Sequence, residues 1–96
     1  MSYRLDVDGD TRLLISHMPP TLKRKVKESF RAIAQYPNEG KPLQEDLEGF
    51  YSYRVGRLRI IYSIESPRKL VHVVAIGPRR TVYEELTKEL APKRRE

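Results

Sequence analysis

A two-residue break between two alternating segments restricts the folds that this chain can adopt. Residues 51–55 and 58–65 each alternate apolar or aromatic side chains with polar ones, a pattern typical of half-buried β-strands. Between them stand only Gly56 and Arg57, and glycine at the first central position suits a two-residue hairpin turn. The segment is therefore predicted to form a β-hairpin whose register is set by its turn.

This register places two arginines directly opposite each other. The predicted cross-strand pairs are Val55 with Leu58, Arg54 with Arg59, Tyr53 with Ile60, Ser52 with Ile61 and Tyr51 with Tyr62. Opposed like charges destabilise a sheet, and a bound phosphate would reverse the sign of that effect. The alternative is that Arg54 and Arg59 extend into water, where screening makes their repulsion small.

The rest of the chain adds helices and further strands around the hairpin. Apolar side chains recur every three or four residues between Thr21 and Tyr36, which predicts an amphipathic helix. The other expected elements are a strand at 3–7, a short helix at 11–17, a loop at 37–42 and a strand at 70–76 that is apolar on both faces. This order predicts an α+β fold, a mainly antiparallel sheet with the two N-terminal-half helices packed on one face and a short C-terminal helix.

The C-terminal helix is predicted to begin at Thr81. Thr81 and Glu84 have the spacing of a capping box, and a buried stripe of Val82, Leu86 and Leu90 would follow. Residues 92–96 are expected to form a basic tail that adds nothing to the core.

Length and composition narrow the class of protein. With 96 residues, the chain is expected to form one domain, residues 1–96. It contains no cysteine, which excludes disulfides, thiol nucleophiles and cysteine zinc sites, and it has no long apolar run. A cytoplasmic protein is expected. Its aspartates and its two histidines lack metal-ligand spacing, so no metal or other cofactor is expected.

Positive charge is confined to the second half of the chain. Residues 1–48 carry equal numbers of basic and acidic side chains, so residues 49–96 carry the whole net charge of +6. Arginine outnumbers lysine there, and its planar guanidinium matches the geometry of phosphate. An anionic polymer, most simply nucleic acid, is the predicted class of partner.

A second pair of arginines precedes the expected C-terminal helix. Arg79 and Arg80 would stand where free backbone N–H groups and the helix dipole favour anions, with Tyr83 in the first turn. A strand linking Arg59 to this segment would bring Arg54, Arg59 and Arg79 to one rim, where Tyr83 is available to stack on a base or exchange a proton. The alternative is a capped helix with solvated arginines.

Two sequence blocks resemble the RelE/ParE toxin superfamily. One runs from Leu47 through the Tyr-Arg-Val-Gly and Arg-Ile-Ile-Tyr segments to Tyr62, and the other runs from Ile76 through Ile-Gly-Pro-Arg to Val82-Tyr83. The resemblance implies the toxin of a type II toxin–antitoxin pair. In the RelE-like branch, such toxins cleave mRNA on the ribosome without a metal and thereby inhibit translation.

The resemblance also implies roles for individual residues. The RelE-like reaction is attack of a ribose 2′-OH on the adjacent phosphate, which needs cations on the developing charge and groups that transfer protons. Arg59 and Arg79 match family arginines that stabilise phosphate charge, and Tyr83 matches a tyrosine that stacks or assists proton transfer. Arg54, Arg57 and Arg80 are added as phosphate-binding residues from the predicted register and helix start.

One departure from the family pattern leaves the proton acceptor unassigned. An ungapped comparison places Phe50 and Ser52 where the best-known RelE pattern has two lysines. Two other functions therefore stay open, a ParE-like inhibitor of DNA gyrase and an inactive relative that only binds its antitoxin. The expected partners are a cognate antitoxin, mRNA on the ribosome and operator DNA through the antitoxin complex alone.

Overall fold

A five-stranded sheet forms the centre of the protein, which we describe from a computed structural model covering residues 2–94, with side chains through Lys88. The strands are β1 (Arg4–Val7), β2 (Lys41–Pro42), β3 (Phe50–Val55), β4 (Leu58–Glu65) and β5 (Leu70–Pro78). Their order in the sheet is β1-β5-β4-β3-β2, and among these described pairs β1 and β5 run parallel while the others run antiparallel. The helices are α1 (Gly9–Ser16), α2 (Pro20–Gln35) and α3 (Arg79–Arg94). The predicted α+β class and the mainly antiparallel sheet are confirmed.

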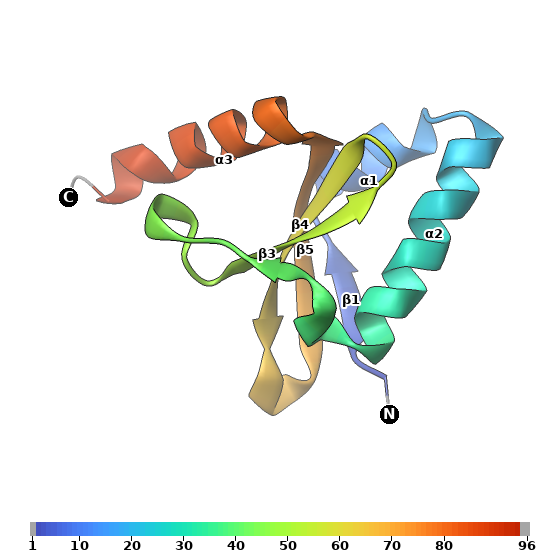
Figure 1. Ribbon diagram of the computed structural model, residues 1–96, viewed down its shortest axis with the longest axis horizontal. Helices are drawn as coiled ribbons and strands as arrows, with labels where there is room; N and C mark the ends of the chain where they lie inside the picture. Colours follow the sequence, from blue (N-terminus) through green and yellow to red (C-terminus); the bar gives the residue numbers. More distant parts are fainter. Residues whose placement is uncertain (1, 95–96) are drawn as a thin grey trace.

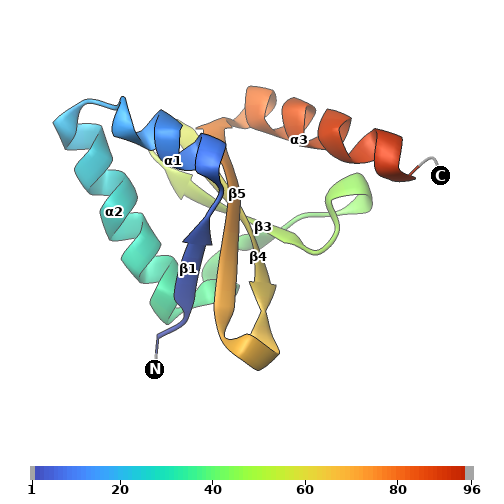
Figure 2. The same cartoon turned by 180° about the vertical axis from the view of Figure 1, so that it is seen from behind.

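The helices cover both faces of the sheet. In Figures 1 and 2, α1 and α2 lie on one side of the strands, and α3 lies with the loop that precedes β3 on the other. The first face buries Val26 and Ile33 of α2 against the sheet, and the second buries Val82 and Leu86 of α3. This second layer explains why β5 is apolar on both faces.

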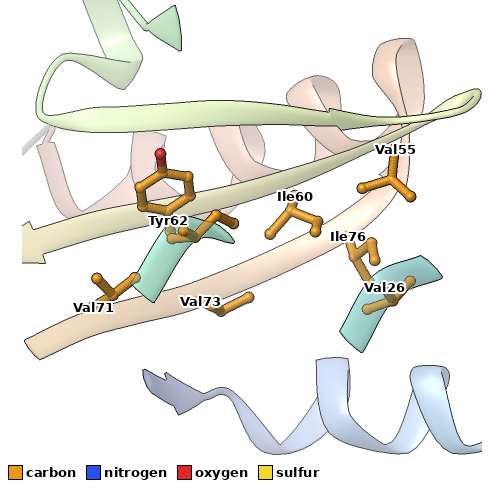
Figure 3. Close-up of a cluster of buried hydrophobic side chains, with 8 residues drawn as sticks. Val26, Val55, Ile60, Tyr62, Val71, Val73 and Ile76 are labelled. Carbon is orange, nitrogen blue, oxygen red and sulfur yellow. The ribbon is translucent and has the colours of Figure 1, made fainter. Parts of the chain in front are cut away.

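The larger core forms between α2 and the sheet. Seven of its side chains from α2 and strands β3, β4 and β5 are labelled in Figure 3, and they are Val26, Val55, Ile60, Tyr62, Val71, Val73 and Ile76. Residues of β3 and β4 reach this core at every second position, as the alternation predicts.

The hairpin has the predicted register in all five pairs. Gly56 adopts a φ of +58°, a left-handed value that a residue with a Cβ rarely takes, so the turn needs glycine at this position. Arg54 and Arg59 are thus cross-strand partners, and Arg59 is also paired with Gly77 of β5.

The start and the length of α3 differ from expectation. The helix begins at Arg79, directly after β5, so Thr81 is its third residue and does not cap it. It is not short, because it runs for 16 residues to Arg94 and includes part of the segment expected to be a basic tail. Val82 and Leu86 are buried as predicted, whereas the Leu90 side chain and residues 95–96 lie outside the described part.

A buried tyrosine fastens the segment before β3 to the sheet. The Tyr62 hydroxyl donates a hydrogen bond to the carbonyl oxygen of Pro37 over 2.7 Å, and burial raises its pKa to about 12, so it stays a neutral donor. A Cβ on Gly40 would collide with this hydroxyl, so glycine allows the chain to pass close to it. The same segment forms β2, which pairs with β3 where a loop was expected.

Replacing Tyr62 with phenylalanine tests this attachment. The change removes the buried donor and leaves the Pro37 carbonyl without it, which should lower the free energy of unfolding by about 1–3 kcal/mol. Urea unfolding of Tyr62→Phe measures the loss, and Tyr36→Phe at an exposed tyrosine is the matched control. Equal unfolding midpoints for the two variants would show that the hydroxyl does not fasten the segment.

Candidate functional site

A cavity opens where α3, the hairpin and the short strand β2 meet. Its volume is about 550 Å³, and its lining contains Lys41, Pro42, Leu43, Gln44, Ser52, Arg54, Arg59, Arg79 and Tyr83. Among the side chains described through Lys88, the lining thus contains four cations and no carboxylate. Unbalanced positive charge in a cavity at this edge of the sheet suits an anion.

Each arginine of the cavity comes from a different place in the fold. Arg54 and Arg59 are opposed on β3 and β4, and Arg79 is the first residue of α3. The pairing of Arg59 with Gly77 brings β4 to the point where β5 passes into α3, as predicted for the strand that links the two arginine pairs. The hairpin register and the start of α3 together gather the three guanidinium groups.

Tyr83 lies one helical turn beyond Arg79. The Arg79 guanidinium stands over the Tyr83 ring at 5.8 Å from its centroid, a distance suited to a cation–π contact. Tyr83 also packs against the core cluster formed by Leu47, Ile61, Val82 and Leu86. The ring is therefore held in place by the arginine and by this apolar cluster.

The three arginines of the cavity lack carboxylate partners within the described side chains. Among the side chains described through Lys88, no ion pair joins Arg54, Arg59 or Arg79 to an aspartate or glutamate. Arg54 instead donates a hydrogen bond of 3.4 Å to the carbonyl oxygen of Gly56. The guanidinium charge of the cavity is left available to an anionic ligand.

Two of the predicted phosphate-binding residues are not part of the cavity lining. Arg57 is exposed in the hairpin turn. Arg80 points its Nε toward Glu84 at 4.0 Å, and its side chain is 90% exposed. Arg80 lies outside the cavity lining because α3 begins at Arg79, and the side chains of neighbouring residues in a helix point in different directions.

Three further polar residues of the lining are Lys41, Gln44 and Ser52. The sequence predicted no role for Lys41 or Gln44, and it marked Ser52 only as a departure from the family pattern. Strand β2 has two residues, too few to show alternation, so Lys41 gave no signal, and Gln44 follows this strand in a loop. Phe50 packs against the core cluster next to α3.

His72 lies on a different part of the sheet and has its own partners. Its Nε2 is 2.9 Å from a carboxylate oxygen of Glu65, and its Nδ1 is 3.4 Å from one of Asp6. The hydrogen bond to Glu65 raises the pKa of His72, and the same bond lowers the pKa of Glu65. Both ring nitrogens of His72 thus face a carboxylate oxygen of a neighbouring residue.

The two pKa shifts define the pH range in which the pair of His72 and Glu65 stabilises the fold. A raised histidine pKa stabilises the protein below the ordinary value of about 6.5, and this contribution is lost as the pH rises through the raised pKa. A lowered glutamate pKa stabilises it above about 4.3, and this contribution is lost as the pH falls through the lowered pKa. The pair therefore contributes most between these two pH values.

We expect His72→Gln to lower the urea midpoint more at pH 5.5 than at pH 8.5. Glutamine retains polar atoms but carries no positive charge at either pH. Urea unfolding of both proteins at both pH values measures the difference. A gap that is the same at pH 5.5 and pH 8.5 would contradict the assignment of the charged pair.

No helix within residues 2–94 has the length and hydropathy needed to span a membrane.

Comparison with known proteins points to one group of toxins. The family described as "ParE toxin of type II toxin-antitoxin system, parDE" matches residues 3–83. Toxin RelE of Mycobacterium tuberculosis is 41% identical over 44 residues, which span 46% of this chain and 45% of that protein. Toxin RelG of the same organism is 28% identical over 85 residues, which span 86% of this chain and 98% of that protein.

Solved structures agree with this fold. The toxin–antitoxin complex RelBE2 from Mycobacterium tuberculosis contains a chain with a TM-score of 0.73 and 26% identity, covering 81% of this chain and 99% of that one. A mutant of Escherichia coli toxin RelE in the free state gives a TM-score of 0.74 at 20% identity, with 98% of each chain covered. At that identity the second likeness concerns the fold alone.

Proposed function

The chain belongs to the ParE toxin family of type II toxin–antitoxin systems, within the RelE/ParE superfamily, and we propose that it is a ribosome-dependent mRNA endoribonuclease. The observation that carries the proposal is the meeting of Arg54, Arg59, Arg79 and Tyr83 in one cavity, where no carboxylate of the described residues lies in the lining. Three guanidinium groups beside an aromatic ring suit a phosphate and its neighbouring base.

The proposed reaction is attack of a ribose 2′-oxygen on the adjacent phosphorus. The 2′-OH gives up its proton, the new P–O bond forms, and the bond to the 5′-oxygen of the next nucleotide breaks as that oxygen takes up a proton. Arg59 and Arg79 stabilise the additional negative charge on the phosphate in the transition state. Tyr83 stacks on a base or donates the proton to the leaving oxygen. Arg54 helps to hold the phosphate.

Arg57 and Arg80 have a different place in this proposal. Both are exposed and outside the cavity lining. They would contact phosphates farther along the RNA or on the ribosome, where an exposed arginine strengthens binding without taking part in the reaction. The proposed setting for all these contacts is the cytoplasm.

An antitoxin is the proposed protein partner. The related structures RelBE2 of Mycobacterium tuberculosis and RelBE of Escherichia coli are toxin–antitoxin complexes. A partner with an acidic or amphipathic segment would complement the cavity and the basic surface around it. Contact with operator DNA would then occur through the antitoxin complex.

Mapping of new mRNA 5′ ends tests the proposed function. Brief expression in bacterial cells should produce cuts within translated codons, and Arg59→Ala should abolish them. Cuts in untranslated RNA as frequent as those in codons would contradict dependence on the ribosome. Growth arrest without any cuts would contradict the nuclease.

A second candidate function is inhibition of DNA gyrase. The match to the family described as ParE toxin favours it, because the resemblance to ParE implies binding to gyrase without cleavage of RNA. Under this alternative, replication stops while translation continues. Normal gyrase supercoiling at saturating toxin would exclude it, and a chain that causes no arrest at all would be an inactive, antitoxin-binding relative.

A further inference from the structure

Ser52 carries a buried hydroxyl whose hydrogen-bonding capacity is unused. The residue is 6% exposed, and its Oγ has no hydrogen-bond partner among the described residues. Buried hydroxyls nearly always have a partner, because an unpaired polar atom lowers the stability of the fold. Ser52 also lines the cationic cavity, so a ligand there can supply the missing partner.

Lys41 stands beside this hydroxyl on the neighbouring strand. It is the register partner of Ser52 in the pairing of β2 with β3, and it lines the same cavity. Directly opposed residues of an antiparallel pair lie on one face of the sheet, with Cβ atoms about 5 Å apart. The ammonium of Lys41 and the hydroxyl of Ser52 can therefore reach one small anion together.

The position of Lys41 is fixed by the fold. The segment that precedes it is tied to the buried Tyr62 hydroxyl through the Pro37 carbonyl, and Gly40 passes close to the same hydroxyl. Leu43 donates its backbone N–H to the carbonyl oxygen of Phe50 over 2.9 Å on the far side of Lys41. These contacts hold the lysine at the edge of the cavity in the absence of a ligand.

We infer that Lys41 and Ser52 form a phosphate-binding subsite, in which both side chains donate hydrogen bonds to the non-bridging oxygens of one phosphate. The family pattern has a lysine on β3 at the position of Ser52. In this chain the lysine of the cavity is Lys41, which comes from β2 instead. That the phosphate belongs to RNA rests on the proposed function, whereas the subsite itself rests on the geometry of β2 and β3.

Titration with inorganic phosphate tests the subsite directly. The full chain, labelled with ¹⁵N, is titrated at constant ionic strength, and sodium chloride serves as the reference salt. Loss of one charge-assisted hydrogen bond should raise the Kd of Lys41→Ala about tenfold, and loss of a neutral one should raise that of Ser52→Ala about threefold. Lys41→Arg should stay close to the original protein because it keeps the charge.

Two controls separate binding from folding. Lys27→Ala removes an exposed lysine of α2 and should leave the Kd unchanged. Ser52→Ala removes an unpaired buried hydroxyl, so its urea midpoint should equal or exceed that of the original protein while its phosphate affinity falls. If Ser52 served only the packing of the sheet, Ser52→Ala would bind phosphate as tightly as the original protein.

The outcomes also separate this inference from the proposed nuclease. Phosphate affinities of Lys41→Ala and Ser52→Ala equal to that of Lys27→Ala would overturn the subsite, whether or not the protein cleaves mRNA. Weaker phosphate binding in both variants would support the subsite even if the unmodified chain made no cuts in translated mRNA, a result that would overturn the nuclease alone.

Discussion

Replacing Arg59 or Arg79 with alanine should abolish toxicity and leave the fold intact. Each substitution removes a guanidinium from the cavity, and the loss of a charge that stabilises the transition state reduces cleavage by about 10²–10³-fold. Neither side chain is part of the buried core, so the free energy of unfolding should change by no more than about 0.5 kcal/mol. Growth after induction and urea unfolding measure the two effects.

Arg31→Ala provides the matched control for these variants. Arg31 is an exposed arginine of α2, on the sheet face opposite α3, and its removal changes the net charge by the same amount. Toxicity equal to that of the unmodified protein is expected for it. If Arg59→Ala and Arg79→Ala lost their toxicity only because they failed to fold, the assignment of both arginines to the reaction would fail.

Tyr83→Phe should reduce cleavage by about 10²-fold. Phenylalanine keeps the ring that packs against the core cluster and lies under the Arg79 guanidinium, and it removes only the hydroxyl. Loss of a positioned proton donor costs about 10²–10⁴-fold in rate. A loss of this size in Tyr83→Phe would assign proton transfer to the hydroxyl.

Single-turnover cleavage on programmed ribosomes measures this effect. Tyr83→Ala, which removes the ring as well, should cleave more slowly still, because it also loses the stacking surface. Tyr36→Phe at an exposed tyrosine should cleave at the original rate. Full activity of Tyr83→Phe would show that Tyr83 only stacks.

The hairpin could be predicted because its determinants are local. The turn at Gly56 fixes the pairing of the residues around it, and alternation decides which face of each strand is buried. The opposed pair Arg54 and Arg59 therefore followed from the sequence alone. Their meeting with Arg79 was predicted only on the condition that a further strand links Arg59 to the Arg79 segment, and β5 does so through Gly77.

The start of α3 could not be read from its sequence. Thr81 and Glu84 have the spacing of a capping box, but this short pattern also occurs inside helices. Pro78 ends β5, where its missing N–H breaks few ladder hydrogen bonds, and the helix follows at once. The position of β5 in the sheet therefore decides where the helix begins, and no local pattern records that position.

The bulge in β5 and the strand β2 escaped prediction for a similar reason. Ile61 pairs with Ala75 and Tyr62 with Val73, so Val74 is an extra residue, and both Val74 and Ala75 face the cluster next to α3. Strand β2 depends on the distant Tyr62 hydroxyl and on its pairing with β3. Lys41 thus reaches the cavity through tertiary contacts that the sequence does not display.

Cleavage of a defined mRNA by the purified protein tests whether the chain is a nuclease that uses the ribose 2′-OH. A defined codon of the mRNA is placed in the A site of programmed ribosomes, and the new 3′ end is analysed. A matched mRNA with 2′-deoxyribose at the attacked nucleotide is the control. We predict a 2′,3′-cyclic phosphate from the ribose substrate and no cut in the deoxy substrate. Cleavage of the deoxy substrate at the same rate would contradict attack by the 2′-OH, and no cleavage together with inhibited gyrase supercoiling would contradict the nuclease.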